Sequence, residues 1–181
     1  MTCWRASGSL VNLDDFGRLF TAFRRTAFRL ETLAAYNVPE EAESLRLWRE
    51  GKPPPAWQKE REWLRMVANA TAAGKAIQRV RVVRQPLSDY VRLEFDWGYP
   101  DNVANGEDIR VLELADGADV PGMVDHDYWL FDDAVAVRME YASDGSFIRP
   151  AEVAEVALYC RCRDVAMARA VPLSQYRART T

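Results

Sequence analysis

Histidine, cysteine and lysine are scarce in this chain, whose 181 residues include one histidine, three cysteines and three lysines. A single histidine excludes any mechanism that needs two imidazoles in one chain. Three cysteines are too few for a disulfide framework at this length. Cys160 and Cys162 lie two positions apart on a predicted helix, so their side chains diverge, and Cys3 is remote from both. Since no zinc-ligand spacing results, the sequence predicts neither a metal site nor a cofactor.

Long apolar runs and nucleotide-binding signatures are also missing. No stretch approaches the ~18 apolar residues that span a bilayer, and the N-terminal segment has no signal-peptide core. Neither a Walker loop, nor a Gly-x-Gly-x-x-Gly motif, nor a Gly-x-Ser-x-Gly elbow occurs. We therefore expect a cytoplasmic protein that has no membrane partner and lacks these nucleotide-binding devices.

The charge balance disfavours non-specific electrostatic binding to nucleic acid. The 24 basic and 27 acidic residues give a net charge of −3. All but three of the cations are arginine, whose planar guanidinium suits paired bonds to carboxylate or phosphate. A coding bias of a GC-rich genome explains the arginine excess more simply. Direct nucleic-acid binding is therefore the least favoured of the binding functions.

The first 74 residues carry helical patterns. Apolar residues recur at three- and four-residue steps from Leu13 to Tyr36, which predicts one long helix. A second helix is predicted to open at Pro39 and stop at Gly51. After three prolines, a third runs from about Ala56 to Ala73 and ends at Gly74.

Beyond Gly74 the pattern changes to that of strands. Residues 77–83 and 109–114 are predicted strands, separated by a short helix that Ser88 can cap and by a loop from Asp101 to Asp108. Further predicted strands at 127–131 and 134–141 flank a two-residue hairpin turn, Asp132-Asp133. After another turn, a closing helix is predicted from Ala151 to about Ala170.

This order predicts an α+β protein in which an N-terminal three-helix layer packs on a mixed β-sheet and a C-terminal helix closes it. Residues 1–74 form the helical layer. Residues 75–181 form the sheet part with the closing helix. We expect the two parts to make one compact unit.

An acidic cluster surrounds the predicted strand at 127–131 and consists of Asp125, Asp127, Asp132 and Asp133. Paired carboxylates can hold a divalent cation or exchange protons, whereas Asp-Asp is also a common hairpin turn. In the enzyme hypothesis, the protein acts on a phosphorylated or nucleic-acid substrate with His126 and Asp132 as acid–base groups.

Arginines form a second cluster, since Arg79 and Arg81 share one face of the strand at 77–83. They can meet phosphate or a partner's carboxylates. The alternative is pairing with acidic residues nearby in the chain, namely Asp89, Glu94 or Asp96. The aromatic content is also high, and Trp4, Trp48 and Trp57 lie where a partner or second subunit could cover them.

Several segments together resemble a known family: Phe28–Leu33, Val80–Val83, Pro86–Tyr90, Asp127–Asp133, Ala170–Pro172 and Tyr176–Arg177. Their order and spacing resemble the actinobacterial domain-of-unknown-function family 6879 over nearly the whole chain. Members of that family are small cytoplasmic proteins encoded beside helix-turn-helix regulators. The resemblance therefore implies a regulatory accessory or a toxin–antitoxin-like component.

The second part of the chain is also similar to half of a phospholipase-D-type fold. In that superfamily the hairpin strand carries a histidine and, two residues on, a lysine. Here His126 is followed by Asp127 and Tyr128, so the cation that holds the phosphate is missing. This likeness implies a degenerate fold that has lost its activity.

We predict a non-catalytic regulatory protein that acts through protein–protein contacts, with a helix-turn-helix regulator as the partner class that the resemblance implies. The predicted binding surface lies where the family-like segments meet and consists of Arg29, Glu31, Arg81, Ser88, Asp89, Tyr90, Trp129, Asp132 and Asp133. In this hypothesis Arg81 and Asp89 orient the partner by charge-assisted bonds. Tyr90 and Trp129 supply contact area.

Overall fold

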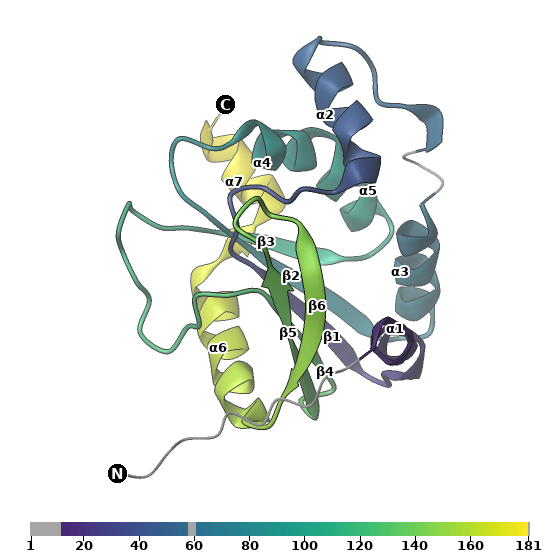
Figure 1. Cartoon of the computed structure of the whole chain (residues 1–181), viewed down its shortest axis with the longest axis vertical. Coiled ribbons are helices and arrows are strands. Elements are labelled where there is room, and N and C mark those ends of the chain that lie inside the picture. The colour runs from purple at the N-terminus through teal and green to yellow at the C-terminus, as the bar shows by residue number, and fades with distance from the viewer. Residues whose placement is uncertain (1–11, 58–60, 181) are drawn as a thin grey trace.

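The computed structural model describes residues 12–57 and 61–180, whose strands form one mixed sheet of seven (Figure 1). The strands are β1 (Thr26–Glu31), β2 (Ala76–Val83), β3 (Asp108–Glu113), β4 (Tyr128–Phe131), β5 (Val135–Tyr141), β6 (Phe147–Val153) and β7 (Val171–Pro172). The helices are α1 (Leu13–Ala22), η1 (Pro39–Glu41), α2 (Ala42–Arg49), α3 (Glu62–Ala72), α4 (Asp89–Leu93), η3 (Glu94–Gly98, a π-helix), α5 (Tyr99–Ala104), α6 (Val156–Arg169) and α7 (Leu173–Thr180).

The strand order is β6-β5-β4-β1-β2-β3-β7. β1, β2 and β3 are parallel neighbours, and β4 to β6 continue from β1 as an antiparallel meander. The connection from β2 to β3 through α4, η3 and α5 is the predicted strand–helix–strand unit. The mixed α+β class is therefore confirmed.

The long helix predicted from Leu13 to Tyr36 is wrong beyond Ala22. Asn12 caps α1 by accepting a hydrogen bond from the Asp15 backbone N–H, and the chain is extended again at the end of this helix. Residues 26–31 then form β1 in the middle of the sheet. Because helices cover both faces of the sheet there, Ala27 is buried on one face and Phe28 and Leu30 on the other, so the apolar residues of β1 do not mark a single buried face. The first 74 residues thus contribute a central strand as well as helices.

The C-terminal prediction is corrected in two places. Residues 147–153 form β6, whereas a helix was predicted from Ala151; the helix starts at Val156. Pro150 is tolerated because β6 is an edge strand, where a missing N–H costs little. After α6 the chain adds β7 and α7, which the sequence analysis did not predict. Helix α5 likewise occupies residues 99–104 and so overlaps the loop predicted from Asp101 to Asp108.

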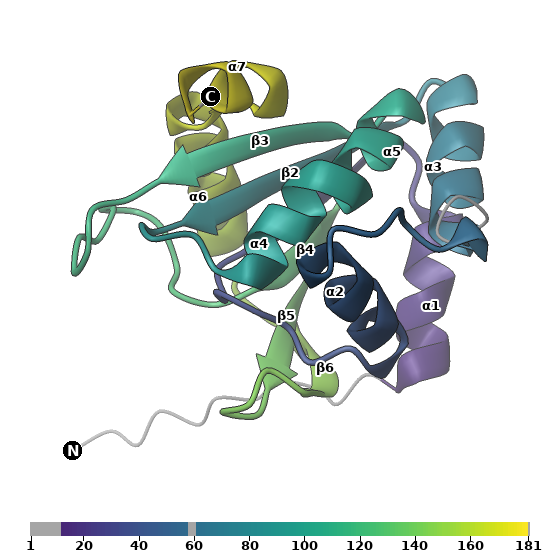
Figure 2. The same cartoon turned by 90° about the horizontal axis from the view of Figure 1, so that it is seen from above.

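The two faces of the sheet carry different residues, one mainly apolar and the other rich in charged side chains. Strand alternation directs Phe28 and Leu30 toward α6, where they pack with Tyr159, Cys162 and Ala166. The opposite face is covered by α1 and α3, with α2 and α4 beside them, as Figure 2 shows. That second face carries the charged residues of β1 and β2. Within the described ranges, no helix is long and apolar enough to cross a membrane.

Candidate functional site

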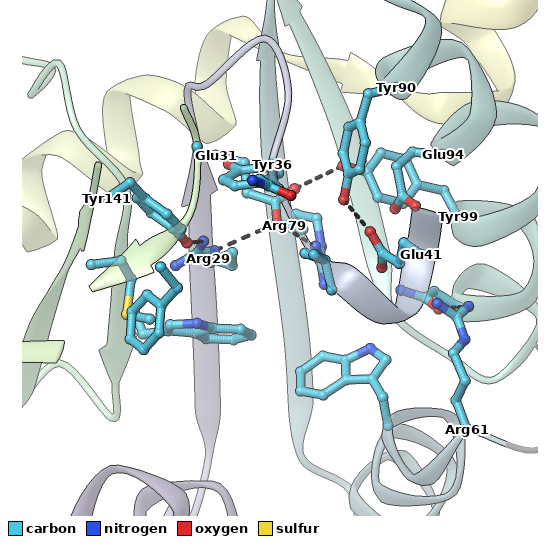
Figure 3. A pocket seen from close by; sticks show the side chains of 18 residues that line it. Arg29, Glu31, Tyr36, Glu41, Arg61, Arg79, Tyr90, Glu94, Tyr99 and Tyr141 are labelled. Carbon is cyan, nitrogen blue, oxygen red and sulfur yellow. Dashed lines mark hydrogen bonds and ion pairs between the residues drawn. The ribbon is translucent and has the colours of Figure 1, made fainter. Parts of the chain in front are cut away.

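A cavity of about 440 Å³ opens on the sheet face opposite α6. β1 and β2 form its floor, and its walls come from the segment before α2, from α3, η3 and α5, and from the β4–β6 meander. Figure 3 shows the side chains that line it. Aromatic rings dominate: Tyr36, Trp63, Tyr90, Tyr99, Trp129, Tyr141 and Phe147. Two sets of charged groups accompany them, one on the floor and one on the wall.

The floor is a network of buried ion pairs. The parallel register places Arg29 beside Arg79 and Glu31 beside Arg81, all on one face. Glu31 accepts from Arg79 at 2.6 Å and lies 3.5 Å from the Nε of Arg29. Arg79 also donates to Glu107 through Nε at 2.7 Å.

Asp127 anchors the other end of this network and is fully buried. Its carboxylate accepts from Arg29 Nη2 at 2.8 Å and from the backbone N–H of Thr32 at 2.7 Å. It also accepts from the hydroxyl of Tyr36. Asp127 thus holds the turn after β1, which places Tyr36 over the floor.

The network balances three arginines against three carboxylates: Arg29, Arg79 and Arg81 against Glu31, Glu107 and Asp127. Burial by itself raises the pKa of Glu31, but the surrounding guanidinium groups more than offset this and lower its pKa to about 2. Glu31 is therefore ionised at neutral pH. Losing one partner of such a buried pair costs about 3–5 kcal/mol, so the floor is a rigid unit.

Arg29 retains one unused hydrogen-bond donor at the edge of this floor. Its Nη2 donates to Asp127 and to the hydroxyl of Tyr141, both at 2.8 Å. Its Nη1 has no partner among the described residues, although the side chain is only 6% exposed. The guanidinium also lies 5.5 Å from the ring centroid of Trp129. A buried donor without a partner is rare in native proteins and requires an explanation, and Arg29 lines the cavity.

The wall carries two carboxyl groups of a different kind, Glu41 from η1 and Glu94 from η3. Burial raises the pKa of Glu94 to about 7, and the carboxylates of Glu41 and Glu31 add to the effect. Burial also raises the pKa of Glu41, although the hydroxyl of Tyr90 donates to it at 2.7 Å. The Glu94 carboxyl group is therefore partly protonated near neutral pH.

The nine residues of the predicted binding surface divide into three groups. Four of its residues line the cavity: Arg29, Glu31, Tyr90 and Trp129. Arg81 lies beneath it, fully buried, and donates to the carbonyl of Leu33 at 2.6 Å, so it holds the turn after β1 and does not reach the surface.

The other four residues lie outside the cavity. Ser88 caps α4 by accepting from the Val91 N–H. Asp89 pairs with Arg49 of α2, and Asp133 pairs with Arg163 of α6. Asp132 accepts from the backbone N–H groups of residues 24–26. The nine residues therefore do not form one continuous surface.

The acid–base pair of the enzyme hypothesis is not assembled. His126 precedes β4 and Asp132 follows it, so the strand separates them. His126 contacts the Asp125 carboxylate at 3.1 Å and the Tyr159 hydroxyl at 3.0 Å. Burial lowers the pKa of His126 despite that carboxylate. Cys3 and Trp4 lie outside the described residues.

His126 lines a second cavity, of about 630 Å³, at the carboxyl ends of β1 and β2. Its arginine, Arg84, donates to the carbonyl oxygen atoms of Ala115 and Ala118. That guanidinium therefore holds the loop after β3. Among residues 12–57 and 61–180, no group of three His, Cys, Asp or Glu side chains is placed to hold a metal ion.

Sequence reasoning missed the wall of the first cavity. Glu41, Glu94, Tyr36 and Tyr99 come from separate elements, and their meeting depends on how α2 and η3 pack over the sheet. The floor did leave a signal. The sequence placed Arg79 and Arg81 on one face of a strand. The same alternation in Arg29-Leu30-Glu31 would have placed Arg29 and Glu31 on one face if that segment had been assigned as a strand.

Fold and cavity together define an α+β protein with a ligand-sized, aromatic-lined cavity over a buried ion network. The comparison with family models places this chain within a family: residues 14–178 match the domain of unknown function DUF6879. The chain belongs to that family, so the resemblance carried by its sequence segments is confirmed. No curated protein shows significant similarity to the chain.

Proposed function

We propose that this protein is a non-catalytic regulatory module that binds a small molecule in the cavity above β1 and β2. The observation that carries the proposal is the unused Nη1 donor of the buried Arg29 at a cavity of about 440 Å³. Small-molecule sites typically span roughly 300–1,000 Å³ and combine apolar walls with a few placed polar groups. The aromatic lining and the ion network supply both parts.

The choice of residues favours binding over covalent catalysis. The described lining of the cavity contains no Ser, Thr, Cys, Lys or His side chain, the residue types that most covalent mechanisms use as the nucleophile. Floor carboxylates such as Glu31 are held ionised by arginines. The site is therefore suited to recognising and orienting a ligand.

The segment that forms the wall also supports a regulatory role. η1 contributes Glu41 to the cavity and leads directly into α2, which carries charged residues on its exposed side. α2 is fixed to the neighbouring helical layer by two contacts, Arg49 to Asp89 at 2.8 Å and Trp48 Nε1 to Asp96 at 2.9 Å. A ligand that displaces Glu41 changes the position of α2, and a partner protein that contacts α2 can detect this change. A helix-turn-helix regulator is the partner class we propose.

The test is a calorimetric screen of amino acids, nucleosides, polyamines and carboxylic acids against the full chain. Any compound that binds is then measured with Phe147→Ala, which removes a ring from the cavity lining, and with Ile148→Ala as the control. Both residues are exposed on β6, and only Phe147 lines the cavity. We expect the first variant to weaken binding at least fivefold and the second to leave it unchanged. Absence of any binding compound, or equal binding by all three proteins, contradicts the proposal.

A further inference from the structure

We propose that the cavity takes a compact zwitterion, with the carboxylate of the ligand at Arg29, its protonated amine between Glu41 and Glu94, and a planar body between the two ends. This inference rests on the proposed ligand-binding function and adds the chemical class of the ligand. The two poles come from opposite sides of the cavity, as Figure 3 shows. Each pole is supported by its own observation.

The anionic pole follows from the unused donor of Arg29. Its Nη1 is buried and unpartnered among the described residues. Burial lowers the pKa of the Arg29 guanidinium, but Asp127 and neighbouring groups raise it above the usual range, so the charge is permanent. The floor as a whole is neutral, since its three arginines face three carboxylates. A ligand carboxylate at Nη1 thus gains a charge-assisted bond without meeting a net negative floor.

The cationic pole follows from the two wall carboxyl groups. Glu41 already accepts a hydrogen bond from Tyr90 at 2.7 Å, which fixes its orientation. Gly98 leaves room for Glu94, because a Cβ at that position would lie 2.8 Å from both carboxylate oxygens. Burial raises the pKa of both groups, to about 7 for Glu94, so without a ligand the Glu94 carboxyl group is partly protonated at neutral pH. A bound ammonium group replaces that proton and satisfies both carboxylates.

The body of the ligand lies against aromatic walls. Trp63 and Trp129 lie 5.6 Å apart between ring centroids and form one side of the cavity. Tyr36 lines the cavity near the turn after β1. Such rings favour a planar or apolar body, which stacks or packs against them. A benzene ring that carries a carboxylate at one end and an aminoalkyl group at the opposite end has all three features: a carboxylate, an amine and a planar body between them.

Two matched sets of probes test the inference with the full chain by calorimetry. One set is 4-(aminomethyl)benzoate, 4-methylbenzylamine and 4-methylbenzoate, and the other is 4-(2-aminoethyl)benzoate, 2-(4-methylphenyl)ethylamine and 4-ethylbenzoate. Within each set, the first probe carries both charges and the others carry one. We expect the zwitterion of at least one set to bind at least tenfold more tightly than its two single-charge analogues. Equal affinities within both sets, or no binding by either zwitterion, overturn the inference.

Variants assign each pole to its residues. Glu94→Gln should weaken the zwitterion and the amine at least tenfold and leave the carboxylate probe unchanged. Arg29→Lys should weaken binding of the zwitterion and of the carboxylate probe and leave binding of the amine probe unchanged. Glu152→Gln, on the exposed side of β6, is the charge-matched control. Unchanged zwitterion binding in Glu94→Gln contradicts the cationic pole even if Arg29→Lys fails to fold.

The two proposals fail in different ways. A neutral or purely anionic compound that binds the wild-type chain and is weakened by Phe147→Ala refutes the zwitterion but keeps the cavity as a ligand site. If no compound of the wider screen binds, both proposals are wrong.

Proton exchange on ligand binding gives an independent readout of the cationic pole. Binding of the zwitterion at pH 7 should release protons, detected as a dependence of the calorimetric enthalpy on the ionisation enthalpy of the buffer.

Discussion

Arg29 and Arg79 are register partners on adjacent parallel strands, with both guanidinium groups on the same face of the sheet. Two like charges at this spacing repel each other, and both are buried. Glu31 makes the arrangement stable, because its carboxylate lies 2.6 Å from Arg79 and 3.5 Å from Arg29. The floor of the cavity therefore depends on the Glu31 carboxylate, which Arg29, Arg79 and Arg81 share.

Replacing that carboxylate should be costly. We expect Glu31→Gln to lower the free energy of unfolding by about 3–5 kcal/mol, because it leaves buried arginines with an uncompensated charge. Urea unfolding at pH 7 measures the change. Glu152→Gln on the surface should alter stability by less than about 0.5 kcal/mol. A loss below 1 kcal/mol for Glu31→Gln would show that the network does not depend on this residue.

The stability of the protein in acid should depend on the ionisation of Glu31. The pKa of Glu31 is lowered from 4.5 to about 2, so its contribution is complete above pH 4.5 and is lost as the pH falls toward 2. Integrated over that range, the loss is about 2–3 kcal/mol. Urea unfolding of the wild type and Glu31→Gln between pH 2 and 6 tests this. The difference between the two proteins should shrink as the pH falls, and a constant difference argues against it.

The β4–β5 hairpin offers a contrast between two adjacent residues. Asp132 accepts from the backbone N–H groups of Arg24, Arg25 and Thr26, whereas Asp133 pairs with Arg163 near the surface. Both adopt positive φ, 53° and 59°, which glycine accepts readily. We expect Asp132→Gly to cost about 1–2 kcal/mol through the lost backbone bonds, and Asp133→Gly less than about 0.5 kcal/mol. Thermal unfolding of both variants checks the order, and equal losses contradict it.

Much of the fold could be predicted because its sequence signals are local. The strands at β2 and β3 alternate and are rich in β-branched residues, and Asp132-Asp133 marked the hairpin turn correctly. β1 was missed because Ala27 is buried on one face of the sheet and Phe28 and Leu30 on the other. The resulting spacing of apolar residues also fits a helix. The phospholipase-D-like relationship of the second half remains a prediction.

The candidate site was predicted only in part, for a physical reason. The family-like segments named Arg29, Glu31, Tyr90 and Trp129, and all four line the cavity. No sequence pattern links them to Glu94, whose position depends on the π-helix η3 lying over the sheet. Long-range packing of this kind cannot be read from periodicity.

Glu94 should make stability fall as the pH rises. Its pKa is raised from 4.5 to about 7, so the folded state binds a proton that the unfolded state releases at lower pH. The stabilisation from that proton is complete below about pH 4.5 and is lost as the pH rises through 7. Since Glu94 is partly exposed, we expect a loss of about 1–2 kcal/mol between pH 5 and 8. Glu94→Gln should abolish this slope in urea unfolding, and an unchanged slope contradicts the assignment.

Gly98 provides a way to move Glu94 without changing its charge. An alanine Cβ at this position would lie 2.8 Å from both carboxylate oxygens of Glu94, so the carboxylate must shift. The backbone of Gly98 has a helical φ of −71°, which alanine accepts, and the displaced group is the end of a flexible side chain. We therefore expect Gly98→Ala to change stability at pH 5 by less than about 1 kcal/mol.

The effect of Gly98→Ala should appear instead in the titration of Glu94. A carboxylate pushed toward solvent loses part of the burial that raises its pKa, so the fall in stability between pH 5 and 8 should become smaller than in the wild type. Gly17→Ala is the matched control, since nothing lies within 4 Å of a Cβ built there and Gly17 is in helix α1. If Gly98→Ala and Gly17→Ala show the same pH slope as the wild type, the close approach of Gly98 to Glu94 does not set the pKa of that carboxyl group.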